Sequence, residues 1–240
     1  MWLLIDAGNT RVKWALHDGH AWQARGHALL NQLEQLALQW VDLPPVMRIM
    51  AANVAGTSVK TQLTDLLARH INKIEWLTPT HQQLDVHNGY TNPLQLGPDR
   101  WAALLGARKL TQGHCLVINI GTAMTVDALT ADGHFLGGII APGFRLMREA
   151  LAQGTAELGR RDGQYIPFPT NTADAIHGGI MQALIGTIGR MQHEMVQAGF
   201  PPVSCVLSGG DASLLQPHLS LTVIMVDNLV LEGLLRIVRE

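Results

Sequence analysis

Two stretches of this chain repeat one strand–turn–strand pattern, and the repeat limits the folds available to it. Residues 3–16 and 116–129 align without gaps over their whole length. Each stretch has an apolar strand, a polar residue (Asp6 or Asn119), a glycine two positions later and then a second strand. Strands joined through polar and glycine residues are typical of hairpins. The sequence therefore predicts two related hairpins, one in each half of the chain.

The turn of each predicted hairpin is rich in groups that can bind anions. Backbone N–H groups and short polar side chains at a tight turn suit the oxygens of a phosphate. Two copies of such a turn favour two related domains that grip a polyphosphate from opposite sides. Glycine turns are common, however, so two ordinary hairpins in a single sheet protein remain the alternative.

Composition narrows the possible partners. The chain has 240 residues, 47% of them hydrophobic and 15% charged, as in globular proteins. Its formal net charge is −2 and it has no long run of Lys or Arg, which argues against nucleic acid or an anionic membrane as partner. The start of the chain does not have the pattern of a secretory leader, and no apolar run is long enough to span a membrane. Cys115 and Cys205 form no paired motif, so we expect reduced thiols and a cytoplasmic protein.

The order of predicted elements indicates an α/β fold. After the first hairpin the periodicity predicts a helix over 28–41 and a strand over 47–52, and strands and helices continue to alternate. The second hairpin begins a new series of the same kind near Gly113. We therefore predict two domains, residues 1–112 and 113–240.

A long polar segment, residues 78–98, interrupts this alternation and ends at the start of a helix over 101–110. Loops of this length in compact domains are often functional. Asp99 lies in the first helical turn, directly after Pro98. It can serve simply as an acid that favours the helix dipole, or as a functional carboxylate held beside the loop, and the sequence leaves both open.

Two features near the end of the chain concern backbone geometry. A strand over 203–207 opens into Ser208-Gly209-Gly210-Asp211, which permits close approach of backbone to a ligand or makes a tight turn. Asp227 is the predicted cap of a final helix over 228–239.

The motifs, taken in order, resemble those of one known family. Asp6-x-Gly8-Asn9-Thr10 and Asn119-x-Gly121-Thr122 are similar to the two phosphate motifs of the acetate and sugar kinase/heat-shock/actin superfamily. Four further motifs make the chain resemble type III pantothenate kinases, including relatives first described as Bvg accessory factors. They are Tyr90, Gly97-x-Asp99-Arg100, Gly137-Gly138-x-Ile140-x-Pro142-Gly143 and Asn171-Thr172-x-x-Ala175-Ile176.

The resemblance covers residues 1–240 and implies a fold, a reaction and an assembly. The fold is α/β, with two duplicated ribonuclease-H-like domains and ATP bound between them. The reaction is phosphorylation of the terminal hydroxyl of pantothenate to give 4′-phosphopantothenate, the first step of coenzyme A biosynthesis. The assembly is a homodimer in which the long helix after Thr172 packs on the partner subunit and each substrate pocket lies near the interface.

The resemblance also assigns roles to residues. Asp99 would be the base, and Asp6 would orient a hydrated Mg²⁺ that accompanies ATP. The residues that would bind nucleotide are Asp6, Ala7, Gly8, Asn9, Thr10, Arg11, Val12, Lys13 and Thr122. The residues that would bind pantothenate are Tyr90, Gly97, Pro98, Asp99, Arg100 and Thr172. Arg100 can bind a carboxylate such as that of pantothenate.

Each of these residues also has an ordinary structural explanation. Asp6 could be a solvated carboxylate at a strand end, Arg100 an exposed helix residue and Lys13 a side chain that points into solvent. At Asn119 the chain departs from the family, which usually has an Asp there that helps to hold a monovalent cation. An amide oxygen can coordinate a cation but adds no charge, so dependence on potassium or ammonium is open. A non-catalytic nucleotide-binding regulator of the same fold is the alternative function.

Overall fold

We describe a computed structural model of the chain that covers residues 1–68, 70, 73–155 and 162–240. The chain forms two compact units, residues 1–109 with 228–240 and residues 110–227. The sequence predicts a division after residue 112. In the structure the first unit ends at residue 109, three residues before the predicted boundary. The final helix belongs to the first unit as well, because it packs against β1 and β4 of that unit.

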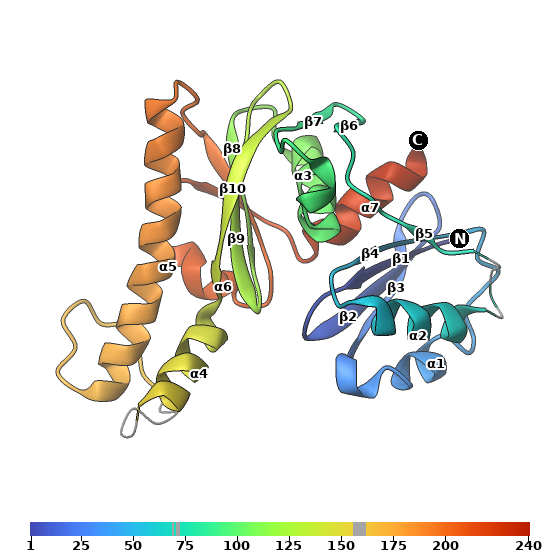
Figure 1. Ribbon diagram of the computed structural model, residues 1–240, viewed down its shortest axis with the longest axis horizontal. Coiled ribbons are helices and arrows are strands. Elements are labelled where there is room, and N and C mark those ends of the chain that lie inside the picture. The colour runs from blue at the N-terminus through green and yellow to red at the C-terminus, as the bar shows by residue number, and fades with distance from the viewer. Residues whose placement is uncertain (69, 71–72, 156–161) are drawn as a thin grey trace. The chain divides into compact units, whose positions relative to one another are not determined.

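The first unit is built on a five-stranded sheet in the order β3-β2-β1-β4-β5 (Figure 1). Its strands are β1 (Trp2–Ala7), β2 (Arg11–His17), β3 (Trp22–Leu29), β4 (Arg48–Asn53) and β5 (Glu75–Trp76). Strands β1, β2 and β3 pair antiparallel, whereas β4 lies parallel to β1 and β5 parallel to β4.

Helices cover both faces of this sheet. Alternation along β1 turns Leu3, Ile5 and Ala7 toward α1 (Gln35–Gln39) and α2 (Thr57–Leu67), with which they form one buried cluster. Leu4 and Asp6 therefore point to the opposite face, where α7 (Leu229–Arg239) packs on β1. Helix α3 (Pro98–Leu110) packs closely against α7. Asp6 is thus the polar end of a strand face that α7 covers.

The long polar segment contains more structure than its composition predicts. Residues 82–83 and 86–88 form the short hairpin β6 (Gln82–Gln83) and β7 (Val86–Asn88), and a 3₁₀ turn, η2 (Pro93–Gln95), precedes α3. Arg108 and Arg236 both form ion pairs with Asp85 and so tie the tip of this hairpin to α3 and α7.

One predicted helix of the first unit is largely wrong. The helix predicted over 28–41 is only a 3₁₀ turn, η1 (Leu30–Gln32), followed by the short α1. Ala28 and Leu29 instead end strand β3, which alternates between exposed and partly buried positions along the edge of the sheet. Few apolar residues are needed at such an edge, so the strand has a weak signal in the sequence.

The second unit repeats the topology of the first. Its own strands lie in the order β12-β11-β8-β9-β10, with β8, β9 and β10 antiparallel and β11 parallel to β8 and β12. They are β8 (Cys115–Ile120), β9 (Ala123–Leu129), β10 (His134–Pro142), β11 (Ser204–Ser208) and β12 (Thr222–Met225). The order matches β5-β4-β1-β2-β3, which confirms the predicted duplication and excludes a single sheet with two ordinary hairpins.

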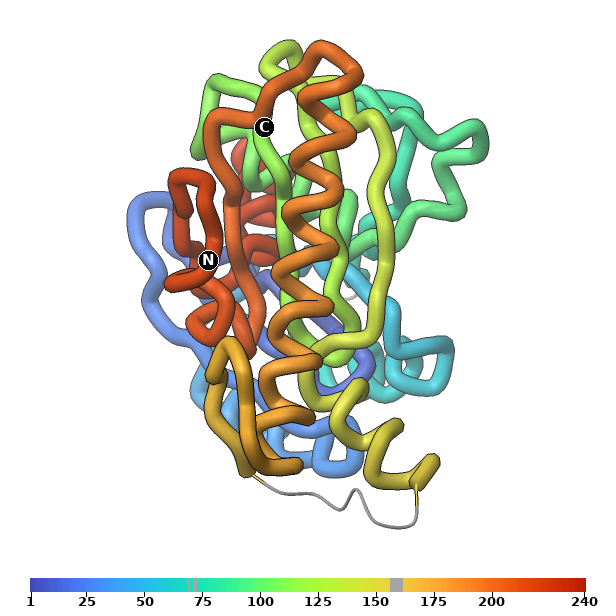
Figure 2. The backbone as a smooth tube through the Cα atoms, turned by 90° about the vertical axis from the view of Figure 1, so that its left-hand side faces the viewer, coloured from blue at the N-terminus to red at the C-terminus, as the bar shows by residue number. Residues whose placement is uncertain are grey.

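The helices of the second unit are α4 (Phe144–Gly154), α5 (Thr172–Gln197) and the short α6 (Ala212–Leu215), with a 3₁₀ turn η3 (Gln216–His218). Figure 2 shows α5 running along the sheet of this unit. Ile180, Leu184 and Ile188 of α5 are buried against that sheet.

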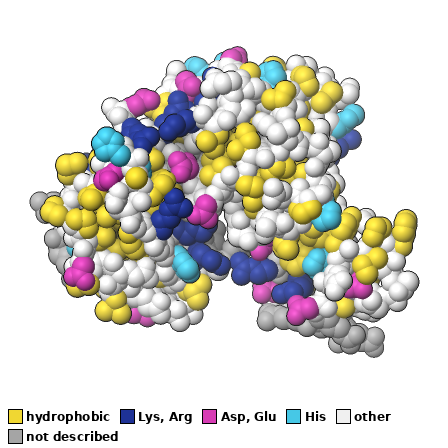
Figure 3. Space-filling view, turned by 180° about the vertical axis from the view of Figure 1, so that it is seen from behind, with side chains coloured by type: hydrophobic (Ala, Val, Ile, Leu, Met, Phe, Trp, Pro, Cys, Tyr) yellow, Lys and Arg dark blue, Asp and Glu magenta, His cyan; other side chains and the backbone are white. Residues whose placement is uncertain are grey.

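Two surface properties bear on possible partners. In the described part of the chain no helix combines the length and apolar character needed to cross a membrane. On the face drawn in Figure 3, Lys and Arg side chains are interspersed with Asp and Glu.

Candidate active site

The first hairpin brings Asp6 and Lys13 together at one end of the sheet. Asp6 is the last but one residue of β1 and lies directly across the strand pair from Lys13. The turn between them is closed by the Gly8 N–H, which donates to the Arg11 carbonyl at 3.1 Å, and Leu30 N–H donates to the Thr10 carbonyl at 3.2 Å. The backbone groups of residues 8–11 are therefore held in a fixed loop beside Asp6.

Asp6 is a perturbed carboxyl group. Its pKa is raised to about 6 from an ordinary value of 3.8, mainly because burial disfavours the charged form, and the negative charge of Asp99 acts in the same direction. The Lys13 ammonium and the Asn228 side chain oppose this rise. Asp6 is consequently not a solvated strand-end residue: it lies among two charged side chains and an amide, and Lys13 is directed at the same place.

The start of α3 presents a second carboxylate. Asp99 Oδ1 accepts the Arg100 backbone N–H at 2.8 Å, so the side chain folds back over the first turn of the helix. A Cβ atom at Gly97 would lie 2.5 Å from this same oxygen, which explains the glycine at that position. Burial raises the pKa of Asp99, while its backbone hydrogen bonds and the Arg100 charge act in the opposite direction.

The structural explanation of Asp99 is confirmed, and its functional role stays a prediction that the geometry supports. Asp99 favours the helix N-terminus through the hydrogen bond to Arg100, and it is also a partly buried carboxyl group close enough to Asp6 for the two charges to interact. Perturbed carboxyl groups that interact in this way are frequent at functional sites.

Arg100 and Tyr90 form the neighbouring part of the site. Arg100 is 5% exposed, so it is a buried cation and not an exposed helix residue. Its Nη1 donates to the Tyr90 hydroxyl at 2.9 Å, and its guanidinium carbon lies 5.7 Å from the centre of the Tyr90 ring. Asn88 Oδ1 accepts the Tyr90 N–H at 3.0 Å and so ties Tyr90 to the end of β7. The first unit thus brings together Asp6, Lys13, Asp99, Arg100 and Tyr90.

The other candidate residues lie in the second unit. Asn119 is the penultimate residue of β8, as Asp6 is of β1, and it pairs with Thr125 across the hairpin. The gapless alignment would place Val126 opposite Asn119, so this hairpin is one residue shorter at its turn than the first. Gly121 N–H closes the turn on the Ala123 carbonyl at 2.9 Å, and Thr122 is exposed at its tip.

Two glycines of the second unit allow close backbone contacts around this turn. Gly143, where β10 leads into α4, donates its N–H to the Thr122 carbonyl at 2.9 Å, and a Cβ there would overlap the turn. Gly209 has a φ of 106° and packs on the backbone of Ile120. Gly209 is therefore explained by its contact with the end of β8, whereas Gly210 has open space where a Cβ would lie.

Thr172 is the first residue of α5 and is exposed. The preceding Asn171 caps the helix, because its Oδ1 accepts the Asp174 N–H at 3.0 Å. Asp174 Oδ1 in turn accepts the Gln164 N–H at 2.7 Å, which fixes the incoming segment on the start of the helix.

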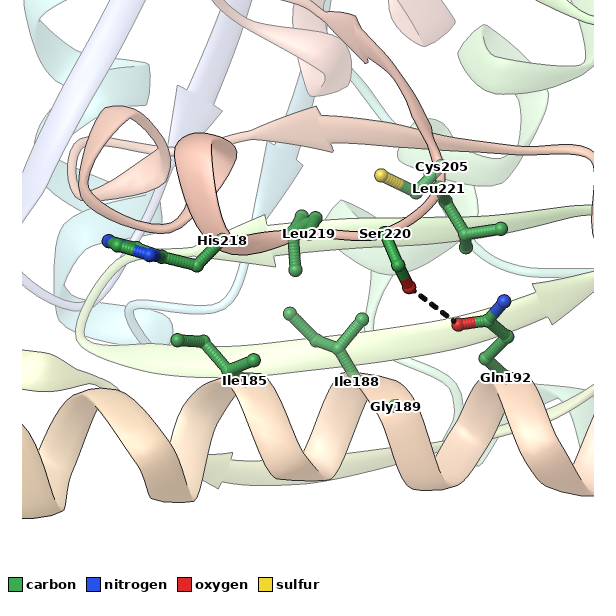
Figure 4. A pocket seen from close by; sticks show the side chains of 9 residues that line it. All are labelled: Ile185, Ile188, Gly189, Gln192, Cys205, His218, Leu219, Ser220 and Leu221. Carbon is green, nitrogen blue, oxygen red and sulfur yellow. Dashed lines mark hydrogen bonds between the residues drawn. The ribbon is translucent and has the colours of Figure 1, made fainter. Parts of the chain in front are cut away.

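A pocket in the second unit is a poor alternative site. It lies between α5 and residues 218–221, and its walls include Ile188, Cys205 and His218 (Figure 4). Its volume of about 50 Å³ is far below the roughly 300–1,000 Å³ of ordinary ligand sites. Burial raises the pKa of the Cys205 thiol to about 11, so the sulfur there is a neutral thiol. Both cysteines are free and buried.

Sequence reasoning missed Asn228. The predicted cap of the final helix, Asp227, is wrong, since Asn228 caps α7 by accepting the Leu231 N–H at Oδ1, 3.1 Å away. The same side chain lies beside Asp6 and lowers its pKa. The order Asp-Asn before an apolar run offers two possible caps, and only the path of the backbone decides between them.

The residues present suit a magnesium–nucleotide complex better than a metal held by protein alone. Within residues 1–68, 70, 73–155 and 162–240, no group of three or more His, Cys, Asp and Glu side chains could hold a metal ion. Mg²⁺ bound with a nucleotide keeps several waters and needs only one or two carboxylates. Asp6 supplies one such carboxylate.

Comparisons with known proteins point to one family. The sequence model of the family described as type III pantothenate kinase matches residues 2–194. A "Type III pantothenate kinase" of Nitrosospira multiformis is 45% identical over 238 residues, which cover 99% of this chain and 91% of the relative.

Two solved structures share the fold. One, named provisionally as a 2-dehydro-3-deoxygalactonokinase protein of Sinorhizobium meliloti, has a TM-score of 0.61 at 17% identity, covering 98% of this chain and 97% of that one. The other, named provisionally as an N-acetylmannosamine kinase of Listeria monocytogenes, has a TM-score of 0.59 at 14% identity with the same coverage. The two units are accordingly duplicated ribonuclease-H-like domains of the acetate and sugar kinase/heat-shock/actin type. By sequence, this chain belongs to the type III pantothenate kinase family.

Proposed function

We propose that this chain transfers the γ-phosphoryl group of ATP to the terminal hydroxyl of pantothenate, with Asp99 as the general base. The observation that carries the proposal is the pair of interacting, partly buried carboxyl groups, Asp6 at the end of β1 and Asp99 at the start of α3. The product is 4′-phosphopantothenate, and the reaction is the first step of coenzyme A biosynthesis.

Asp99 has the properties of a base for an alcohol. A primary hydroxyl is a weak nucleophile until a positioned group accepts its proton during transfer. In the reaction the hydroxyl oxygen forms a bond to the γ-phosphorus, the bond from phosphorus to the bridging oxygen of ADP breaks, and the hydroxyl proton passes to Asp99. Because burial raises the pKa of Asp99, the carboxylate is a stronger proton acceptor than a solvated Asp.

Arg100 and Tyr90 support recognition of an acidic substrate. Arg100 is a buried cation at hydrogen-bond distance from a phenol hydroxyl, and a guanidinium binds a carboxylate through paired hydrogen bonds. We assign the pantothenate carboxylate to Arg100 and the rest of the pocket to Tyr90, Gly97, Pro98 and Thr172.

The two hairpin turns supply the proposed phosphate contacts. Residues 6–13 offer backbone N–H groups and the Lys13 ammonium, and Thr122 offers its hydroxyl and N–H in the second turn. Mg²⁺, when bound with ATP, neutralises the negative charge that spreads over the transferred phosphoryl group. Asp6 would hold water molecules of that ion.

A monovalent cation is a further proposal. Asn119 is the last but one residue of β8, at a position where the family usually has Asp. Its amide oxygen is a neutral ligand. We expect potassium or ammonium, if used, to bind near Asn119 with reduced affinity.

We also propose a homodimer in the cytoplasm. Part of the apolar stripe of α5 covers its own sheet, but Gly179, Gly186 and Gly189 on the same helix have open space where a Cβ would be. Ile140 on β10 is 64% exposed. Small residues on an open helix face and an exposed apolar side chain in the same unit support packing of a second copy. The two free thiols support a reducing compartment.

The activity is tested by incubating the purified protein with pantothenate, ATP and Mg²⁺ in several monovalent salts and following 4′-phosphopantothenate by mass spectrometry. Asp99→Asn is the matched variant, since it keeps the shape of the side chain. Folded protein that forms no product in any salt would contradict the proposal.

A further inference from the structure

Asn228 makes two contacts at the start of α7. Its Oδ1 accepts the Leu231 N–H at 3.1 Å and so caps the helix. Its Nδ2 is buried, and among the described residues it has no acceptor at hydrogen-bond geometry, yet it lies near enough to Asp6 to lower the pKa of that carboxyl group. Helix α7 packs on the face of β1 that carries Asp6, and because the capping bond occupies Oδ1, the amide nitrogen is the group left to face that carboxyl group.

The helix that carries Asn228 is firmly attached to the helix that carries Asp99. Gly106 of α3 faces the α7 backbone near Leu229, and Gly233 of α7 faces the α3 backbone at Ala102, so that a side chain at either glycine would overlap the opposite helix. Arg236 Nη1 also donates to the Leu105 carbonyl at 3.0 Å. The packing of α3 on α7 therefore holds the first turns of the two helices in a fixed relation to each other near Asp6.

We propose that Asn228 is a positioning residue for Asp6: it couples the cap of α7 to the orientation of the Asp6 carboxylate toward the magnesium–nucleotide complex. This inference rests on the role of Asp6 under the proposed function. The amide donates to one carboxylate oxygen when Asp6 is engaged and leaves the other oxygen for water of the metal ion. Because Nδ2 has no other acceptor at hydrogen-bond geometry among the described residues, little competes with Asp6 for it.

Two substitutions separate the cap from the contact with Asp6. Asn228→Ser keeps an N-cap oxygen but removes the amide, whereas Asn228→Ala removes both. We expect Asn228→Ser to unfold at the same denaturant midpoint as the wild type and to need roughly 3- to 10-fold more Mg²⁺ for half-maximal rate, the worth of one hydrogen bond. The KM for pantothenate should not change. Asn228→Ala should show the same Mg²⁺ requirement together with a lower midpoint.

The control is Glu232→Gln in the first turn of the same helix. Glu232 accepts from Trp22 Nε1 and favours the helix dipole, but no contact joins it to Asp6. It should lower the midpoint and leave the Mg²⁺ requirement unchanged, which separates helix stability from positioning.

Combining Asn228→Ser with Asp6→Asn tests whether Asn228 acts through Asp6. Binding of Mg²⁺–ATP, measured by calorimetry, should fall for Asn228→Ser in the wild-type background and show no further fall in the Asp6→Asn background. An unchanged Mg²⁺ requirement in folded Asn228→Ser, or an equal loss in both backgrounds, would overturn the inference. Wild-type protein that makes no phosphopantothenate would instead contradict the proposed function, and the two failures are distinct.

Discussion

Replacing Asp6 by Asn should stabilise the folded protein at neutral and alkaline pH while impairing its use of nucleotide. The pKa of Asp6 is raised to about 6 in the folded chain, against 3.8 for an ordinary Asp. Between these values the folded state binds more protons than the unfolded state, so wild-type stability falls as pH rises through that window. Asn cannot ionise and does not carry this cost.

The size of the effect follows from the shift. A difference of 2.2 pKa units (6 − 3.8) corresponds to about 3 kcal/mol when the group is fully ionised. By linkage, about 1 kcal/mol of this destabilisation is already present at pH 4.5. The remaining amount of about 2 kcal/mol should therefore appear between pH 4.5 and 8. Since Asp6 retains some exposure to solvent, which screens its charge, we expect a change of about 1–2 kcal/mol.

The assay compares chemical unfolding of Asp6→Asn and wild type at pH 4.5 and pH 8 in a chelator without nucleotide. The free energy of unfolding of the variant should increase relative to that of the wild type as pH rises. Asp18→Asn is the control, because Asp18 accepts the His20 and Ala21 N–H groups and its pKa is lowered. The stability that Asp18 contributes is lost only as pH falls below its ordinary pKa, so the difference between this variant and the wild type should change little between pH 4.5 and 8. If the Asp6→Asn difference does not depend on pH, Asp6 is not a buried, charged group in the folded protein and the reasoning fails.

Four other substitutions test the site. Asp99→Asn should cut turnover by roughly 10²–10⁴-fold with little change in folding, as measured by initial rates and circular dichroism; full specific activity would remove Asp99 as the base. Arg100→Lys should raise the KM for pantothenate about 10-fold or more, because an ammonium cannot make paired hydrogen bonds, and an unchanged KM would place the carboxylate elsewhere. Gly97→Ala should lower the turnover number more than it changes either KM, since its methyl group displaces Asp99 Oδ1, and steady-state kinetics decide this. Asn119→Asp should strengthen activation by potassium, seen as a lower salt concentration for half-maximal rate, and an identical salt response would show that no cation binds there.

The sequence predicts most of the fold because the repeated hairpins fix the topology of both units. An apolar strand, a glycine turn and a second apolar strand leave little choice of pairing, and the parallel strands follow from the helices between them. The edge strand β3 and the helix predicted over 28–41 are the failures. At this edge only every second residue faces the core, and Gly26 and His27 hide the alternation.

The sequence predicts which residues belong to the candidate site, but it does not predict their hydrogen bonds or their pKa shifts. Motif order identifies Asp6, Asp99 and Arg100, yet neither the hydrogen bond from Arg100 to Tyr90 nor the raised pKa of Asp6 follows from spacing. Both depend on which helix covers which face of the sheet. Asn228 is the clearest case, because it is 222 positions from Asp6 in the sequence (228 − 6) and reaches it only through the return of α7 to the first unit.

The two copies of the hairpin have diverged where their chemistry differs. In the first, Asp6 faces Lys13 across a turn with one more residue, and charged groups of α3 and an amide of α7 gather on the same face. In the second, the corresponding strand ends in Asn119 opposite Thr125, so both cross-strand partners are neutral. A carboxylate and an ammonium side by side can hold a metal ion and a phosphate, whereas an amide and a hydroxyl can only offer hydrogen bonds or weak cation ligands. We therefore expect the ionic interactions of phosphoryl transfer to fall on the first unit, and loss of charge at position 119 to impair activity less than loss of charge at position 6.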